Sequence, residues 1–349
     1  MARSTWNPPS PFQTTTVEWE GPSPAARLQV AHDHARSILS ENRSPDLPFR
    51  WSVNPYRGCT HACAYCYARR HHEFLGYGAG TDFETRILVK RNAPALLEAA
   101  FRRPGWAGER IAFSSVTDCY QPLERRYRLT RGCLEVCARF RNPVAILTRS
   151  PLVVRDLDLF RSLQQHQAVS VSLSLPILDR ATCQAIEPGA PLPSQRLAAI
   201  RTLSEAGISV GVSISPVIPG LNDRQLPAIL QAARDAGAQH AWMGLVRLVG
   251  SVEPVFTQRL EHALGTARTQ SILRRIQAAR PPERFSTMGE GHGPAWAATE
   301  RLFQLWRTRL GFTGRPVPPA RSPFRVPGSG QQLHLRWAPP GATPRREPS

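Results

Sequence analysis

The sequence predicts an α/β protein whose core is a partial (β/α)6 TIM-like barrel, an open array of about six strand–helix units. Short apolar stretches alternate with helix-like stretches of about 10–15 residues along most of the chain. Glycines follow two of the predicted helices, at Gly207 and Gly237, where a helix commonly ends. Polar and reactive residues follow several predicted strands, which is where such barrels carry their functional groups.

The first predicted strand, residues 49–54, alternates apolar and polar side chains as a half-buried strand does. A loop with three cysteines follows it directly, and residues 64–74 are predicted to form the next helix. Residues 86–90 are predicted to be a short extended piece. The same alternation then predicts helices at 94–102, 130–141 and 154–164, and strands at 110–115 and 144–148.

The second half of the barrel continues this pattern. Strands are predicted at 168–175, 209–218 and 240–248, and helices at 194–206, 223–236 and in segments from 255 to about 279. Because helices of this length separate the strands, the strands are expected to be parallel.

Four regions are therefore expected along the chain. Residues 1–45 form an irregular N-terminal leader with a short helix near 25–39, and residues 46–280 form the barrel. Residues 281–310 form a C-terminal helical extension, in which Trp296, Leu302, Phe303 and Trp306 recur at helical spacing. Residues 311–349 are rich in Pro, Arg, Gly and Ser and are expected to be disordered.

The formal net charge is +18, and Lys90 is the only lysine, so nearly all positive charge is arginine. This charge suits a polyanion such as nucleic acid, and a solvated basic surface is the alternative. No stretch of about eighteen apolar residues predicts a membrane span. Residues 1–20 lack the apolar segment of a secretory signal, so a cytoplasmic location is expected.

The strongest motif is a C-x3-C-x2-C loop formed by Cys59, Cys63 and Cys66. Thiolate is a soft ligand that suits iron–sulfur clusters and zinc. A cubane cluster normally takes four cysteines, so three would leave one iron without a protein ligand. An open coordination position is where metal chemistry usually takes place.

With Tyr65 directly before Cys66, this loop resembles the signature of radical S-adenosylmethionine (SAM) enzymes. The resemblance implies a [4Fe–4S] cluster on the three cysteines, whose fourth iron is chelated by SAM. It also implies that a flavodoxin- or ferredoxin-like donor supplies one electron, which cleaves SAM to methionine and a 5′-deoxyadenosyl radical. A partial barrel of six units is also the usual fold of that superfamily.

A structural zinc site is the alternative interpretation of the three cysteines, with His61, His71 or His72 as the fourth ligand. Zinc sites usually contain paired C-x2-C motifs, and the chain has no second pair. This alternative corresponds to a zinc-stabilised nucleic-acid-binding protein without catalysis.

Residues 114–124 make the resemblance closer, because they look like the T-D-P-Y-Q-P-x-E stretch of the spore photoproduct lyase-like, or DNA-repair photolyase-like, branch. Thr117 and Asp118 match a Ser–Asp pair that contacts SAM there. Cys119 replaces the proline, and its thiol is a candidate hydrogen-atom donor or a small buried residue. The lyase's own cysteine donor matches Ser115 in this chain.

Three further residues match SAM contacts of that branch. Arg149 stands where a lysine is common and is expected to bind the SAM carboxylate, with a surface arginine as the alternative. Ser172 lies on a strand whose alternate serines share a face. Gly220 belongs to a turn that resembles the adenine contact. Glu187 and Arg196 resemble a pair that holds a loop over the site or is merely structural.

The sequence thus predicts a radical SAM enzyme that abstracts hydrogen from a substrate, possibly nucleic acid, in a spore photoproduct lyase-like reaction. A peptide or a small metabolite is the alternative substrate class for the same enzyme.

Overall fold

The computed structural model describes residues 4–12, 19–43, 49–281, 289–313 and 321–328. Its centre is a seven-stranded open sheet in the order β10-β9-β8-β7-β6-β3-β2. Six neighbouring strands are parallel, and β2 pairs antiparallel with β3 at one edge. The strands are β2 (Leu39–Glu41), β3 (Trp51–Val53), β6 (Ile111–Phe113), β7 (Val144–Thr148), β8 (Val169–Ser174), β9 (Val210–Val217) and β10 (His240–Leu245). The predicted partial barrel of six parallel units is confirmed.

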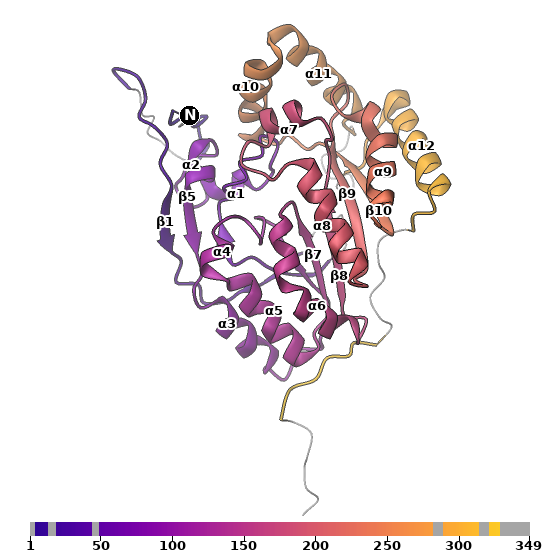
Figure 1. Ribbon diagram of the computed structural model, residues 1–349. Coiled ribbons are helices and arrows are strands. Elements are labelled where there is room, and N and C mark those ends of the chain that lie inside the picture. The colour runs from indigo at the N-terminus through magenta and orange to yellow at the C-terminus, as the bar shows by residue number, and fades with distance from the viewer. Residues whose placement is uncertain (1–3, 13–18, 44–48, 282–288, 314–320, 329–349) are drawn as a thin grey trace, which may run out of the picture.

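Six helices cover the sheet and follow one another side by side (Figure 1). The first five cross back along the sheet, so that the next strand of the sheet starts at the same end as the one before. They are α3 (Ala93–Phe101), α5 (Leu129–Phe140), α6 (Leu157–Gln164), α8 (Pro193–Glu205), α9 (Leu226–Asp235) and α12 (Gly293–Arg309). Short 3-10 turns, η1 (Pro151–Asp156) and η2 (Asp223–Gln225), precede α6 and α9 within the predicted helices.

The connections that leave the carboxyl ends of the strands carry additional helices. After β3 come α1 (Arg69–Glu73) and α2 (Thr81–Thr85), after β6 comes α4 (Glu124–Tyr127), and after β8 comes α7 (Arg180–Ile186). After β10 come α10 (Val252–Leu264) and α11 (Thr266–Ala279), and α10 packs against α7. Helix α1 is shorter than the predicted 64–74, because turns occupy the residues between the cysteines.

The helix expected near 25–39 was a wrong prediction. This segment contains β1 (Gln29–His32), which pairs in parallel with β5 (Arg86–Val89), and it leads into β2. β5 also pairs with β4 (Tyr56–Arg57), so β1, β5 and β4 form a separate three-stranded sheet. Free edges of β5 and β3 offer hydrogen bonds that override the local sequence pattern.

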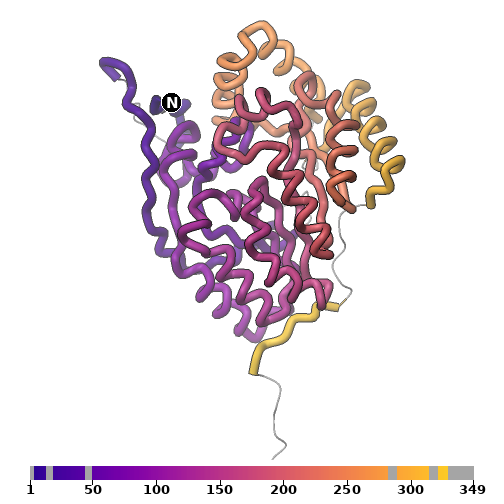
Figure 2. Tube along the Cα trace, in the orientation of Figure 1, coloured from indigo at the N-terminus to yellow at the C-terminus, as the bar shows by residue number. Residues whose placement is uncertain are grey.

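Part of the expected C-terminal tail packs on the protein. Phe324 lies against Phe101 and Phe140, with ring centroids 5.8 and 6.1 Å away, and the Arg325 N–H donates to the Phe140 carbonyl at 2.9 Å. Figure 2 shows this yellow segment at the opposite end of the molecule from α10. Residues 314–320 and 329–349 of the predicted tail lie outside the described residues, and the four domain boundaries stay a prediction.

The stripe on the C-terminal helix is a packing surface, as its spacing suggested. Trp296 and Phe303 of α12 are buried, and α12 packs against α9 and α11. Within the described ranges, none of the helices has both the length and the apolar character that crossing a bilayer requires.

The pH dependence of stability should depend on His72, whose buried ring lies 5.1 Å from Tyr77 and 5.7 Å from Phe83 between centroids. Burial lowers the pKa of His72 to about 4. The unfolded chain protonates this residue near pH 6.5, so its stabilising contribution is complete above that pH and is lost as the pH falls toward 4.

Lowering the pH from 7 to 5 should therefore cost about 2 kcal/mol of unfolding free energy through His72 alone. Urea unfolding of the wild type and of His72→Phe at both pH values measures this difference. If the two proteins lose the same stability between pH 7 and pH 5, the assignment to His72 is wrong.

Candidate active site

Three cysteine side chains gather beyond the carboxyl end of β3. Cys59 and Cys63 are buried and Cys66 is half-buried. The thiols are close enough to influence one another's charge and that of the Arg149 guanidinium beside them. Burial raises the pKa of the Cys63 thiol well above its ordinary value, while the positive charge of Arg149 acts in the opposite direction. The loop therefore brings three thiols together beside one cation.

The three thiols can be compared with the needs of a zinc ion and of a cubane cluster. In the described parts of the chain, no three His, Cys, Asp or Glu side chains converge as a mononuclear site requires, with each ligand about 2–2.3 Å from one ion. A cubane cluster binds each thiolate to a different iron, so the loop need only surround a larger space. Of the alternative zinc ligands, His61 pairs with Asp118, His72 is buried in the aromatic contacts described above, and His71 is exposed.

A buried arginine, Arg69, donates hydrogen bonds to the backbone of the cysteine loop. Arg69, at the start of α1, is fully buried and donates to the carbonyl of Cys63 at 2.8 and 3.0 Å. It also donates to the carbonyls of Ala79 and Gly80, and its charge is balanced by Glu84 at 2.6 Å. One side chain thus joins the loop to the segment that precedes α2.

Two side-chain amides connect the cysteine loop with the segment that follows β6. Gln121 donates to the Gly58 carbonyl at 3.1 Å and accepts from the Thr60 N–H at 3.2 Å. Asn54, directly after β3, donates to the Ser115 hydroxyl at 2.8 Å and accepts from the next amide at 2.9 Å. Both amides are buried, so their hydrogen bonds fix the relative position of two strand ends.

The carboxylate of Asp118 accepts three hydrogen bonds within the protein and lies beside His61. One oxygen accepts from the Thr148 hydroxyl at 2.6 Å and the Tyr120 N–H at 2.9 Å. The other accepts from the Arg149 N–H at 2.8 Å and lies 3.3 Å from Nδ1 of His61. A carboxylate has about four acceptor positions. Asp118 therefore connects the loops after β3, β6 and β7, and three of its about four acceptor positions are taken by hydrogen bonds within the protein.

Electrostatics agree with this buried ion pair. Burial opposes the charged form of Asp118, but His61 and the hydrogen bonds hold the pKa of the carboxyl well below its ordinary value. Burial likewise acts against the His61 imidazolium, but Asp118 and Cys59 raise its pKa to about 9.

Thr117 and Cys119, the neighbours of Asp118 in sequence, make contacts within the protein. The Thr117 hydroxyl donates to the Tyr56 carbonyl at 3.1 Å. Cys119 is fully buried in the core, and burial raises the pKa of its thiol well above the ordinary value. Its carbonyl accepts from the Thr130 hydroxyl at 2.6 Å.

A second network surrounds Arg149. Its guanidinium donates to Glu187 at 3.3 Å and to the Tyr65 hydroxyl at 3.2 Å, and Tyr65 donates to the same oxygen of Glu187. The other oxygen of Glu187 accepts from the buried Arg196, which also donates to the Ser174 carbonyl at 3.0 Å. The structure brings Tyr65, Arg149, Glu187 and Arg196 together as one polar cluster.

The inner face of the sheet carries small side chains beside this cluster. Ser172 on β8 is buried and aligned with Gly211 on β9, and the next pair on the same face of the strands is Ser174 and Ser213. The hydroxyl of Ser213 is buried and has no hydrogen-bond partner among the described residues. The Trp242 side chain packs over Gly211, where an added Cβ would meet it at 3.0 Å, so the unpartnered Ser213 hydroxyl is what this face offers a ligand.

Gly220 lies in the turn after β9 with φ +86°, a conformation that glycine adopts without strain. It is close to α11, where a Cβ at this position would meet the Arg275 side chain at 2.8 Å. The predicted adenine-contacting turn thus lies at the carboxyl end of the sheet. The side of Gly220 that would carry a Cβ faces α11.

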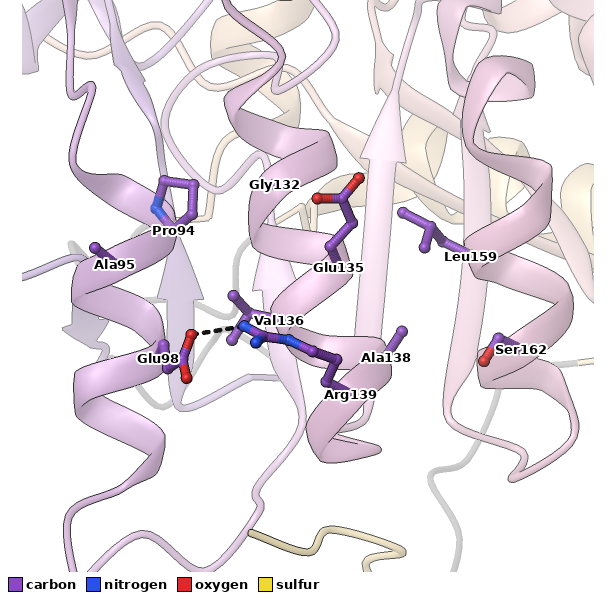
Figure 3. A pocket seen from close by; sticks show the side chains of 10 residues that line it. All are labelled: Pro94, Ala95, Glu98, Gly132, Glu135, Val136, Ala138, Arg139, Leu159 and Ser162. Carbon is purple, nitrogen blue, oxygen red and sulfur yellow. Dashed lines mark hydrogen bonds and ion pairs between the residues drawn. The ribbon is translucent and has the colours of Figure 1, made fainter. Parts of the chain in front are cut away.

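A surface groove of about 930 Å³ lies between α3, α5 and α6 (Figure 3). An ion pair between Glu98 and Arg139, at 2.6 Å, spans its floor. Its lining comes from the outer helices and includes none of the three clustered cysteines. This groove is therefore separate from the candidate active site.

A glycine allows the segment after α7 to touch the cysteine loop. The Gly189 N–H donates to the His61 carbonyl at 3.1 Å, and a Cβ on Gly189 would lie only 2.0 Å from the Thr60 carbonyl oxygen. Real Cβ atoms do not approach backbone so closely, so any side chain at this position must displace one of the two segments.

Gly189→Ala should therefore open the cysteine loop and expose its thiols, because the added methyl group has no space. We expect the native cluster-free protein to react several-fold faster with a thiol reagent. Gly105→Ala is the matched control, since an added Cβ there meets nothing within 4 Å. Equal rates for both variants would contradict the proposed close packing.

Comparison with known proteins gives the family. The sequence model of the Radical SAM superfamily matches residues 53–233. An uncharacterized protein of Mycobacterium tuberculosis is 37% identical over 285 residues, which cover 80% of this chain and 81% of that protein. A protein of a Pseudomonas phage named Radical SAM Nα-GlyT isomerase is 24% identical over 263 residues, covering 75% of this chain and 52% of that protein.

Among solved structures, spore photoproduct lyase complexed with a dinucleoside spore photoproduct superposes with a TM-score of 0.59 at 17% identity, covering 82% of this chain and 81% of that chain. At this identity the likeness shows the fold alone. Members of the superfamily use a [4Fe–4S] cluster and SAM, and the three clustered thiols at the carboxyl end of the sheet, two buried and one half-buried, fit that cluster. The chain belongs to the radical SAM superfamily.

Proposed function

We propose that this protein reductively cleaves SAM and uses the 5′-deoxyadenosyl radical to abstract a hydrogen atom from a nucleic acid. The observation that carries the proposal is the enclosure of Cys59, Cys63 and Cys66 beside the Arg149 guanidinium, within the matched family region. When bound to the three thiolates, the cluster supplies one electron to SAM at an iron without a protein ligand.

In this proposal, Arg149 binds the SAM carboxylate and offsets the negative charge of the thiolates. Two of its N–H groups donate to Glu187 and Tyr65, which leaves three of the five for a ligand. The same two contacts fix the guanidinium, so less side-chain entropy is lost when a carboxylate binds.

Asp118 and Thr117 act as positioning residues in the proposal, which replaces the expected direct contact with SAM. Their polar atoms are engaged by neighbouring strand ends. The Ser213 hydroxyl is the better candidate for a ligand contact, because it has no hydrogen-bond partner among the described residues, and Ser172 lies on the same strand face.

The nucleic-acid substrate is supported by the net charge of +18 and by the lyase-like stretch at 114–124. A low-potential flavodoxin- or ferredoxin-like protein is proposed as the electron donor. No specific contact favours a peptide or a small metabolite. The zinc-binding alternative loses support, since the chain is a radical SAM protein whose candidate histidine ligands have other environments.

Replacing any one of Cys59, Cys63 and Cys66 by Ala should remove a cluster ligand. After anaerobic reconstitution with iron and sulfide, we expect at least a hundredfold less 5′-deoxyadenosine than from the wild type. Cys133→Ala, on α5, is the control thiol and should retain cleavage. If any of these three variants cleaves SAM at the wild-type rate, that cysteine is not a cluster ligand.

Cys119→Ala separates the two predicted roles of that thiol. If Cys119 only packs in the core, the variant should cleave SAM at an unchanged rate per cluster and should lose about 1 kcal/mol or more of unfolding free energy. A hydrogen donor predicts that product formation from nucleic acid falls while SAM cleavage continues. Urea unfolding and product analysis of the same variant distinguish them, and we expect the stability effect.

A further inference from the structure

We propose that a row of exposed aromatic side chains on and beside α1 stacks with unpaired bases of a nucleic acid, an inference that rests on the proposed substrate class. The row consists of Phe12, Tyr67, His71 and Phe74, and we call it the aromatic row. Arg70 is adjacent to it on the same helix. The proposal commits to a single-stranded or locally unpaired nucleic acid as the occupant.

The orientation of α1 is the first argument. Tyr67, His71 and Phe74 are spaced i, i+4 and i+7, which normally marks the side of a helix that faces the core. Here that side faces solvent, and Phe74 is 61% exposed and Tyr67 40%. The buried side of the helix carries the polar Arg69 and Glu73 instead. Packing of the protein core therefore does not account for the aromatic residues.

The rings form a continuous series. The ring centroids of Phe12 and Phe74 are 4.8 Å apart, those of Phe74 and His71 are 6.2 Å apart, and those of His71 and Tyr67 are 6.4 Å apart. Neighbouring rings are tilted or edge-on, so the faces of several rings remain available. Adjacent exposed aromatic side chains of this kind are typical of binding surfaces.

The row begins at the candidate active site. Tyr67 directly follows Cys66, and its hydroxyl donates to the carbonyl of Ser115 after β6. Arg70 lies next to Gly250 in the connection after β10, since a Cβ on that glycine would be 3.3 Å from the arginine Nε. A ligand on the aromatic row would therefore extend from the cysteine loop outward along the rim of the sheet.

Charge favours nucleic acid over an uncharged partner. Burial lowers the pKa of His71, and the nearby positive charges of Arg70 and of Arg57, which pairs with Asp33 at 2.8 Å, lower it further. Aromatic faces beside arginines are the combination that single-strand binders use, because every base offers a π-face and phosphates bind guanidinium groups. Stacking contributes about 1–3 kcal/mol per base in such proteins.

The test measures binding of a fluorescein-labelled single-stranded oligothymidylate to the reconstituted protein by fluorescence anisotropy. The double variant Phe12→Ala/Phe74→Ala should bind at least fivefold more weakly, which equals about 1 kcal/mol. The slope of log K against log salt should stay the same, because no phosphate contact is removed. Leu305→Ala, an exposed apolar residue of α12, is the matched control and should bind like the wild type.

Several results would overturn the proposal. The first is an undetectable affinity of the wild type at low salt, and the second is equal affinities of the wild type and the double variant. A third is a different oligomeric state of the double variant in light scattering, which would make the aromatic row an interface between copies of the chain. A further one is slower reduction by a protein donor with unchanged oligonucleotide binding, which would assign the row to that donor.

The assay also separates this inference from the proposed function. The double variant leaves the cluster ligands and Arg149 intact, so it should form 5′-deoxyadenosine without substrate at the wild-type rate. If the wild type cleaves SAM but the double variant binds the oligonucleotide equally well, only the aromatic row fails. If the wild type does not cleave SAM, the proposed function fails whatever the binding result.

Discussion

The rest of the structure depends on one constraint, which is that the cysteine loop has backbone groups that no helix or strand of its own can satisfy. Buried N–H and C=O groups without partners are costly, so neighbouring segments must supply hydrogen bonds. Arg69 and Gln121 supply them from side chains. The N–H of Cys59 donates to the Phe83 carbonyl at 2.9 Å, and that of Ala64 to the Ile186 carbonyl at 2.8 Å. The loop is thus held from several sides while its sulfurs stay available.

Because of this constraint, residues 114–124 after β6 have a structural role in addition to any contact with a ligand. Asp118 joins three strand ends, and Gln121 holds the cysteine loop. Glu124 accepts from the Tyr56 hydroxyl and from the Thr130 N–H, and pairs with Arg155 at 2.8 Å. These buried charged and polar groups form one connected set, and removal of a member would leave another unsatisfied. The stretch therefore acts mainly as the support of the site.

Much of the fold follows from local patterns in the sequence. The strand predicted at 144–148 is β7 with the same bounds, and the α8 and α9 helices end before Gly207 and Gly237 as expected. These elements are determined by side-chain periodicity and by glycine conformations that neighbours in sequence reveal. The strands β1 and β2 could not be found in this way, because β1 depends on a partner strand far along the chain and β2 has only three residues in which to show a pattern.

The site was predictable where residue type determines the chemistry. The three cysteines and the Glu187–Arg196 pair were recognised by spacing and resemblance, and the structure brings each group together. Arg69, Gly189 and Ser213 were missed, since their roles arise from burial, a close approach and an unpartnered hydroxyl. The role of Asn54 could have been suspected from the sequence, because its side-chain amide directly follows a predicted strand. Asp118 was found, but its three hydrogen bonds and its pairing with His61 depend on three-dimensional positions.

The most direct test of the central claim is electron paramagnetic resonance of the anaerobically reconstituted, dithionite-reduced protein with and without SAM. Three cysteines around one space predict a reduced [4Fe–4S] cluster with an iron open to SAM. We therefore expect a cluster signal whose line shape changes when SAM is added. A protein that holds zinc and gives no cluster signal, or a cluster signal that SAM leaves unchanged, would contradict this account of the site.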